Sequence, residues 1–276
     1  MTLSFRRLPR RLVVVARKGG VGKTTTAAQL AMALAQIFGI EVLLVDQDPQ
    51  ANASARVGVA EGEAPRTLND VYLWVLQHPE FGIHHAIHPT TWPGVSVVVA
   101  EEALKFRESE GDHLMDLRLR LAFERSAAEL AERFGAVVID TLPGTGALLR
   151  NAILGATDLL VVTDPEPDGL KGADRAIKAA QSIKATQHPD LNILGILVNG
   201  YDASLGEHQR CVADLVAAHG DLVWEPWVPH RADVLTARGL QVPVQRIKAN
   251  GARDYVRKLN IHARRIGAAL DLQENK

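Results

Sequence analysis

The feature that most constrains the fold of this chain is a glycine-rich loop between a short apolar run and a helical pattern. The apolar run covers residues 12–16, and the loop that follows reads Arg-Lys-Gly-Gly-Val-Gly-Lys-Thr-Thr at residues 17–25. Three glycines before a helix let consecutive backbone N–H groups turn toward one anion, and the helix N-terminus adds a partial positive charge. This order of strand, loop, Lys-Thr and helix predicts a site that holds phosphate groups.

Two side chains of the loop have separate expected roles. Lys23 would reach the outer phosphates of a nucleotide, and the Thr24 hydroxyl would bind Mg²⁺. Arg17 stands where the general pattern of such loops has a glycine.

Apolar runs alternate with helical patterns along most of the chain. The runs cover residues 12–16, 42–45, 95–100, 136–139, 159–162, 193–198 and 222–228, and continuous runs are typical of strands buried on both faces. Helical patterns cover residues 27–38, 117–134 and 170–186, with a shorter one at 68–76. Alternating strands and helices favour right-handed βαβ units. We therefore predict one doubly wound α/β domain over residues 1–276, with a mostly parallel sheet flanked by helices on both faces.

Composition narrows the classes of protein. Hydrophobic residues make up 47% of the 276 residues, so a core can be buried. No apolar run reaches the roughly 18 residues of a membrane span. Cys211 is the only cysteine, which excludes an internal disulfide and fits a reducing, cytoplasmic setting. Its apolar neighbours predict packing in the core.

Charge is uneven along the chain, although the formal net charge is only −1. Residues 231–276 contain ten Lys and Arg against four Asp and Glu, a net charge of +6, which leaves −7 for the first 230 residues. A basic C-terminal segment suggests either a surface that contacts an anion or an ordinary solvated helix face.

A group of closely spaced histidines, His84, His85 and His88, lies in the least regular region, residues 61–112. His84 and His88 are four residues apart, a spacing that can hold a metal ion if the segment is helical, and His85 lies between them. No carboxylate or thiol completes the set and Pro89 follows at once, so a solvated loop is the preferred interpretation.

Several motifs together resemble the ParA/MinD family of P-loop ATPases. Residues 18–24 are similar to its deviant Walker A motif, in which Lys18 is the additional lysine. The segment Asp46-Gln47-Asp48-Pro49-Gln50-Ala51-Asn52 resembles switch I, and Asp140-Thr141-Leu142-Pro143-Gly144 resembles Walker B with switch II. The match extends from about residue 11 to residue 259, where the tail resembles the C-terminal helix of ParA proteins. Residues 1–10 are expected to form a short arm without a helix-turn-helix domain, so site-specific operator binding is not expected.

The resemblance implies ATP and Mg²⁺ as cofactors and a set of site residues. Lys18, Lys23 and Asp48 would be catalytic, with Asp48 positioning the hydrolytic water. Thr24 would bind Mg²⁺ directly, while Asp46 and Asp140 would act on it through water. The implied nucleotide-binding residues are Lys18, Gly19, Gly20, Val21, Gly22, Lys23, Thr24, Thr25, Gly144, Asn199 and Pro229.

The resemblance also implies an ATP-dependent homodimer in which Lys18 of one subunit reaches the phosphates of the other. No arginine finger in cis is identifiable, so slow intrinsic hydrolysis and stimulation by a ParB-type centromere-binding partner are expected. The dimer would bind nonspecific DNA during plasmid or chromosome segregation, in the cytoplasm and on the nucleoid. The candidate DNA-binding residues are Arg246, Lys248, Arg253, Arg257 and Lys258.

Three alternatives remain open. A MinD-like membrane-cycling ATPase needs a C-terminal amphipathic anchor, and Ile261, Ile266 and Leu270 make only a thin apolar stripe, so no membrane contact is expected. An iron-protein-like reductase needs paired cysteines, which Cys211 alone does not supply. A non-hydrolysing adaptor would use ATP only as a dimerisation ligand, whereas the three aspartates of the motifs favour hydrolysis.

Overall fold

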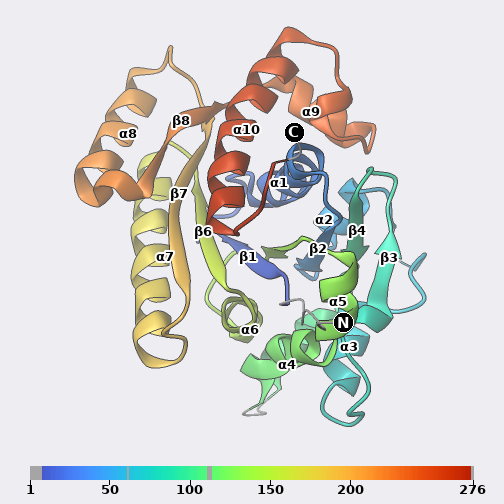
Figure 1. Cartoon of the computed structure of the whole chain (residues 1–276). Coiled ribbons are helices and arrows are strands. Elements are labelled where there is room, and N and C mark those ends of the chain that lie inside the picture. Colours follow the sequence, from blue (N-terminus) through green and yellow to red (C-terminus); the bar gives the residue numbers. More distant parts are fainter. Residues whose placement is uncertain (1–7, 61, 111–113, 275–276) are drawn as a thin grey trace.

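A computed structural model describes residues 8–60, 62–110 and 114–274. Within these residues one eight-stranded sheet has the order β3-β4-β2-β5-β1-β6-β7-β8 (Figure 1). Every neighbouring pair is parallel except β3 with β4. The strands are β1 (Arg10–Val15), β2 (Val42–Gln47), β3 (Ile87–Pro89), β4 (Val95–Val98), β5 (Ala136–Thr141), β6 (Asp158–Thr163), β7 (Asn192–Tyr201) and β8 (Val223–Pro229). Each predicted apolar run overlaps one strand, and only the short edge strand β3 was not predicted.

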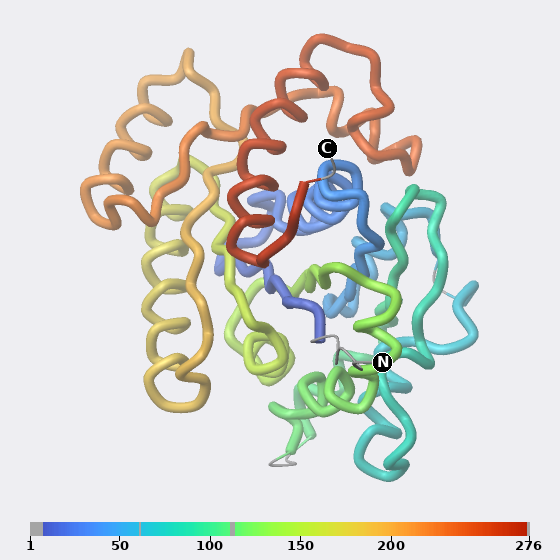
Figure 2. Tube along the Cα trace, in the orientation of Figure 1, coloured from blue at the N-terminus to red at the C-terminus, as the bar shows by residue number. Residues whose placement is uncertain are grey.

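Helices cover both faces of this sheet, as predicted (Figures 1 and 2). One face carries α1 and α10, and the other carries α4, α6 and α7. The α-helices are α1 (Lys23–Phe38), α2 (Asn52–Arg56), α3 (Leu68–Trp74), α4 (Arg118–Arg125), α5 (Ala127–Arg133), α6 (Ala147–Gly155), α7 (Pro167–Thr186), α8 (Gly206–His219), α9 (Ala232–Gly239) and α10 (Asn250–Ala269). Short 3₁₀ helices are η1 (Ile83–Ala86), η2 (Glu102–Ser109), η3 (Met115–Leu117), η4 (Gly220–Leu222) and η5 (Val244–Arg246).

The central strand β1 shows why the strands appear as continuous apolar runs. Leu12 and Val14 belong to the core beneath α1 and α10, whereas Val13 and Val15 belong to the core on the opposite face. All four side chains are buried because helices cover both faces of the sheet.

The helix predicted over residues 117–134 is instead broken into η3, α4 and α5. The break lies at Ser126, whose hydroxyl donates a hydrogen bond to the carbonyl oxygen of Ala122 at 2.9 Å. A serine that bonds to the backbone in this way competes with the regular helical pattern. The prediction of one continuous helix was therefore wrong.

His84, His85 and His88 contact neighbouring groups of the protein. His84 Nδ1 lies 2.8 Å from the Ser126 hydroxyl, and His88 Nε2 lies 2.7 Å from the carbonyl oxygen of Arg66. The ring of His85 stacks on Phe81 with the centroids 4.5 Å apart. Among the described residues there is no group of three or more His, Cys, Asp or Glu side chains suited to a metal ion.

The C-terminal helix packs its apolar face into the core. Ile266 and Leu270 are buried against the face of the sheet that α1 covers, and only Ile261 of the three stripe residues is largely exposed. None of the described helices has the length and apolar character to cross a membrane. Cys211, on α8, is completely buried, which confirms the predicted core packing.

Candidate nucleotide-binding site

The glycine-rich loop joins β1 to α1 at the carboxyl end of the sheet, where β1 lies between β5 and β6. Gly20 and Gly22 have φ values of 83° and 85°, a left-handed conformation that glycine adopts without strain. Asn199, near the end of β7, donates a hydrogen bond from Nδ2 to the carbonyl oxygen of Val21 at 2.8 Å. A side chain at Gly22 would collide with this amide group. Asn199 therefore ties the loop to the end of β7.

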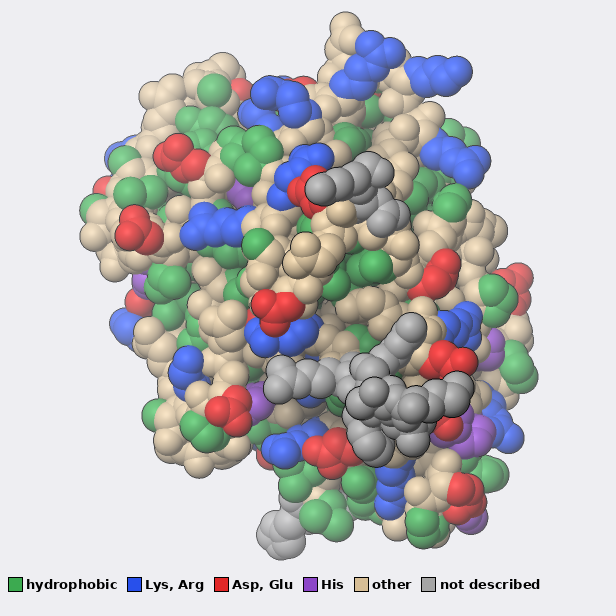
Figure 3. Space-filling model, viewed as in Figure 1, with side chains coloured by type: hydrophobic (Ala, Val, Ile, Leu, Met, Phe, Trp, Pro, Cys, Tyr) green, Lys and Arg blue, Asp and Glu red, His purple; other side chains and the backbone are tan. Residues whose placement is uncertain are grey.

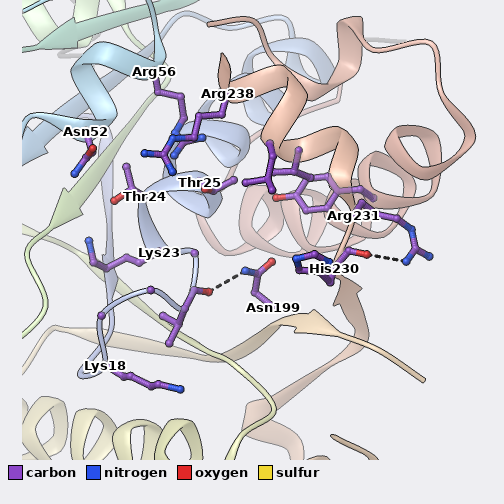
Figure 4. Close-up of a pocket in the computed structure, with 18 of the residues that line it drawn as sticks. Lys18, Lys23, Thr24, Thr25, Asn52, Arg56, Asn199, His230, Arg231 and Arg238 are labelled. Atoms are coloured by element: carbon purple, nitrogen blue, oxygen red, sulfur yellow. Dashed lines mark hydrogen bonds between the residues drawn. The ribbon is translucent and has the colours of Figure 1, made fainter. Parts of the chain in front are cut away.

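A cavity of about 410 Å³ opens over the loop (Figure 4). Residues 18–25 form its floor, Asp48 and Asn52 contribute from the segment after β2, and Asn199 and Pro229 contribute from the ends of β7 and β8. The structure thus brings together all the residues predicted to bind nucleotide except Gly144, whose neighbour Pro143 lines the cavity in its place.

Lys23 forms a buried ion pair at the floor of the cavity. Its Nζ lies 2.9 Å from Asp140 Oδ1 and also contacts the carbonyl oxygen of Thr141. The Lys23 side chain is 6% exposed and that of Asp140 is 0% exposed. The second carboxylate oxygen of Asp140 is buried without a hydrogen-bond partner.

Asp46 and Asp140 face each other as paired residues of β2 and β5. One oxygen of Asp46 accepts hydrogen bonds from the backbone N–H and hydroxyl of Ser54 at 2.8 and 2.7 Å, and the other accepts from the Asp48 N–H at 3.1 Å. Burial and the nearby charge of Asp140 raise the pKa of Asp46 to about 7. Asp46 therefore anchors the segment that carries Asp48, whose own pKa is raised by burial.

These side chains fit a magnesium ion. Mg²⁺ prefers oxygen ligands such as carboxylates and hydroxyls. Thr24 lines the cavity beside Lys23, and Lys23 pairs with Asp140. The unpartnered oxygen of Asp140 offers an acceptor for a water ligand of the ion. Asp46 has both oxygens engaged by Ser54 and Asp48, so its contribution would be mainly to hold the segment of Asp48 in place.

Lys18 lies at the edge of the cavity and is directed away from Lys23 (Figure 4). Its Nζ donates hydrogen bonds to Asp164 at 2.7 Å and to Glu166 at 2.5 Å, in the segment between β6 and α7. These two bonds raise the pKa of Lys18 and hold its ammonium group at the edge of the cavity.

Comparison with known proteins decides the family. A family model described as an AAA domain matches residues 10–193. The chain is 30% identical to the chromosome partitioning protein ParA of Caulobacter vibrioides over 90% of this chain and 92% of that protein. It is 33% identical to the chromosome-partitioning ATPase Soj of Thermus thermophilus over 83% and 84% of the two chains. The chain belongs to the ParA/Soj family of P-loop ATPases.

A solved structure extends this agreement to the bound ligands. Cobyrinic acid a,c-diamide synthase from Mycobacterium smegmatis, with bound ADP and magnesium, matches with a TM-score of 0.76 at 25% identity. The match covers 98% of this chain and 100% of that one. It confirms the P-loop fold and agrees with ATP and Mg²⁺ as the predicted cofactors.

Several residues of this ParA/Soj-family cavity were not predicted from the sequence. Arg17, which had no explanation in the loop motif, donates a hydrogen bond from Nη1 to the carbonyl oxygen of Gly144 at 2.9 Å and so ties the loop to the end of β5. The cavity is also lined by residues from α2, from the end of β8, from α9 and from α10, namely Arg56, His230, Arg231, Val234, Leu235, Arg238 and Tyr255. No motif marks these positions, because elements far apart in the sequence bring them together.

Proposed function

We propose that this protein is an ATP-hydrolysing switch for DNA segregation, on a plasmid or a chromosome. It would act as an ATP-dependent homodimer in the cytoplasm, bound to nonspecific DNA of the nucleoid. A ParB-type centromere-binding partner would stimulate its slow intrinsic hydrolysis. The observation that carries the proposal is the convergence of Lys18, Lys23 and Asp48 on one cavity. The similarity to the ParA and Soj partition proteins supports it.

The cavity residues have complementary roles in this proposal. The loop N–H groups and Lys23 hold the outer phosphates of ATP. Magnesium, when bound near Thr24 and Asp140, neutralises part of the phosphate charge. Asp48 orients the attacking water, and Asp46 fixes the backbone of Asp48 through the 3.1 Å hydrogen bond. Lys18 contacts Asp164 and Glu166 in the single chain, and in the dimer it would exchange these carboxylates for the phosphates of the second subunit.

Asp48→Ala is expected to lower ATP turnover by about 100-fold, because the group that orients water is lost. ATP binding should persist, since the loop and Lys23 are unchanged, and the variant should accumulate as an ATP-bound dimer. Phosphate release and ATP affinity, measured in parallel, check this result. Asp190→Ala is the control, because Asp190 is an exposed acid outside the cavity. Turnover equal to wild type would remove Asp48 from catalysis.

The candidate DNA-binding residues differ in whether an acidic side chain pairs with them. Asp254 forms ion pairs with Arg231 at 2.7 Å, with Arg257 at 2.9 Å and with Lys258 at 3.9 Å. In the part of the chain that the structure describes, Arg246, Lys248 and Arg253 are exposed and form no ion pair. Lys and Arg side chains gather over the end of the molecule that carries α9 and the start of α10 (Figure 3). We therefore assign most of the phosphate contact to the three unpaired residues.

Binding to a random-sequence DNA duplex, with ATP and with ADP across a range of salt, tests the proposed function. We expect ATP-dependent binding that weakens steeply with salt, because phosphate contacts release counterions. Replacing Arg246, Lys248 and Arg253 together by alanine should reduce the slope of log K against log salt by about 0.9 for each lost contact. The matched control replaces Arg257 and Lys258, which Asp254 already pairs, and should have a smaller effect.

Absence of DNA binding with both ATP and ADP would contradict the proposal. Binding to liposomes would then be measured in place of binding to DNA. A membrane anchor on α10 would need the apolar face of that helix to be free. Ile266 and Leu270 of that stripe are instead part of the core, at 0% and 3% exposure.

A further inference from the structure

Arg56, the last residue of α2, is a buried cation without a counterion. Its exposed fraction is 8%, and it lines the nucleotide cavity (Figure 4). Its Nε is buried without a hydrogen-bond partner, and among the described residues no carboxylate pairs with the guanidinium. Burial lowers the pKa of Arg56 and the charge of Arg238 lowers it further, and the opposing effect of the Asp140 charge does not cancel them. A buried and unpaired arginine is costly unless an anion occupies the adjacent space.

Arg238 and Tyr255 add two further donors to the same wall. Arg238, an exposed residue on α9, lies beside Arg56 in the cavity and has no ion pair within the described part of the chain (Figure 4). The hydroxyl of Tyr255, on α10, is buried without a hydrogen-bond partner. Thr25, in the first turn of α1, lies next to this wall in the same view. Three donors from three separate elements therefore face one space without an acceptor.

The other cations of the cavity are already paired. Lys18 is held by Asp164, Lys23 by Asp140, and Arg231 by Asp254. Arg56 and Arg238 thus stand apart as a cluster of positive charge that the protein does not neutralise with its own carboxylates. The glycine loop and Lys23 are assigned to the outer phosphates. We therefore expect the cluster of Arg56 and Arg238 to bind a different anionic group.

We propose that Arg56, Arg238 and Tyr255 form a second phosphate-binding wall, which holds a phosphate group beside Thr25. The planar guanidinium suits this role because it binds two phosphate oxygens at once. This inference rests on the proposed binding of nucleotide to the loop. The phosphate has two possible sources with the same chemistry: the α-phosphate of ADP or ATP, or an additional phosphate on the ribose.

The test compares the affinities of ADP and of adenosine 3′-phosphate 5′-diphosphate by calorimetry. The proteins are the wild type, Arg56→Ala, Arg56→Lys and Arg238→Ala, with Arg175→Ala as the control. Arg175 is an exposed arginine on α7 that does not line the cavity. Thermal unfolding without ligand is measured for each protein. The Arg56→Ala protein should unfold at or above the wild-type temperature, because it no longer carries an unpaired buried charge.

If the wall holds the α-phosphate, Arg56→Ala lowers the affinity for both ligands by about tenfold or more. Arg56→Lys lowers it by less, because lysine keeps the positive charge but cannot bind two phosphate oxygens at once. If it holds a ribose phosphate, the wild type prefers the 3′-phosphorylated ligand by about tenfold and both alanine variants lose that preference. If Arg56→Ala and Arg238→Ala both bind the two ligands with wild-type affinity, the proposed phosphate-binding wall is wrong, while the nucleotide site still stands. Failure of the wild type to bind ADP would overturn the nucleotide site as well.

Discussion

Replacing Lys23 by alanine is expected to lower the affinity for ATP by about 100-fold. The lysine lies at the cavity floor with a side chain that is only 6% exposed, so its charge acts on a bound phosphate with little screening by water. Charge-assisted hydrogen bonds to phosphate contribute about 1.5–3 kcal/mol each, and the loss of more than one accounts for this factor. Calorimetry, or displacement of a fluorescent nucleotide, measures the change.

This variant needs a folding control because Lys23 is also the partner of Asp140. Removing one member of a buried ion pair costs about 3–5 kcal/mol, and Asp140 is fully buried. The double variant Lys23→Ala, Asp140→Asn removes both charges and should be the more stable of the two. Asp140→Asn alone retains the lysine and serves as the matched comparison. If the folded double variant binds ATP as tightly as Asp140→Asn, the role given to Lys23 is wrong.

Burial on both faces explains why most of the sheet could be predicted from the sequence. Strands such as β1 and β5 are covered by helices on both sides, so each contains an unbroken run of four apolar residues. The edge strand β3 is short and only partly buried, and its sequence has no comparable pattern. The break at Ser126 was missed because it depends on one hydroxyl that bonds to the backbone and also contacts His84 from another element.

The floor of the site was predictable for a different reason. A strand, a glycine loop and a helix must follow one another in the sequence, so the spacing of residues 12–26 carries their geometry directly. The partners of these residues do not follow from spacing. Lys18 and Asp164 are 146 positions apart, and Lys23 and Asp140 are 117 apart. Only the strand order places such residues in contact, and the same holds for Arg56 beside Arg238.

Lys18→Ala is expected to abolish ATP-dependent dimerisation while leaving the ATP affinity of the monomer within about twofold of wild type. The reason lies in the geometry of the single chain. Lys18 Nζ is engaged by Asp164 and Glu166, so the monomer site loses no phosphate contact when this side chain is removed. In the proposed dimer the lysine would exchange these carboxylates for the phosphates of the opposite subunit, a charge contact that the variant cannot make.

The measurement is sedimentation or light scattering with ATP and with ADP, in the Asp48→Ala background so that hydrolysis does not disperse the dimer. Lys171→Ala is the matched control, because Lys171 is an exposed lysine on the neighbouring α7 that pairs only weakly with Asp168, at 3.7 Å. The control should dimerise as the parent does. Dimers of normal stability in the Lys18 variant would show that Lys18 acts within its own chain. Its hydrogen bonds to Asp164 and Glu166 would then be its functional contacts, and not contacts that it gives up in the dimer.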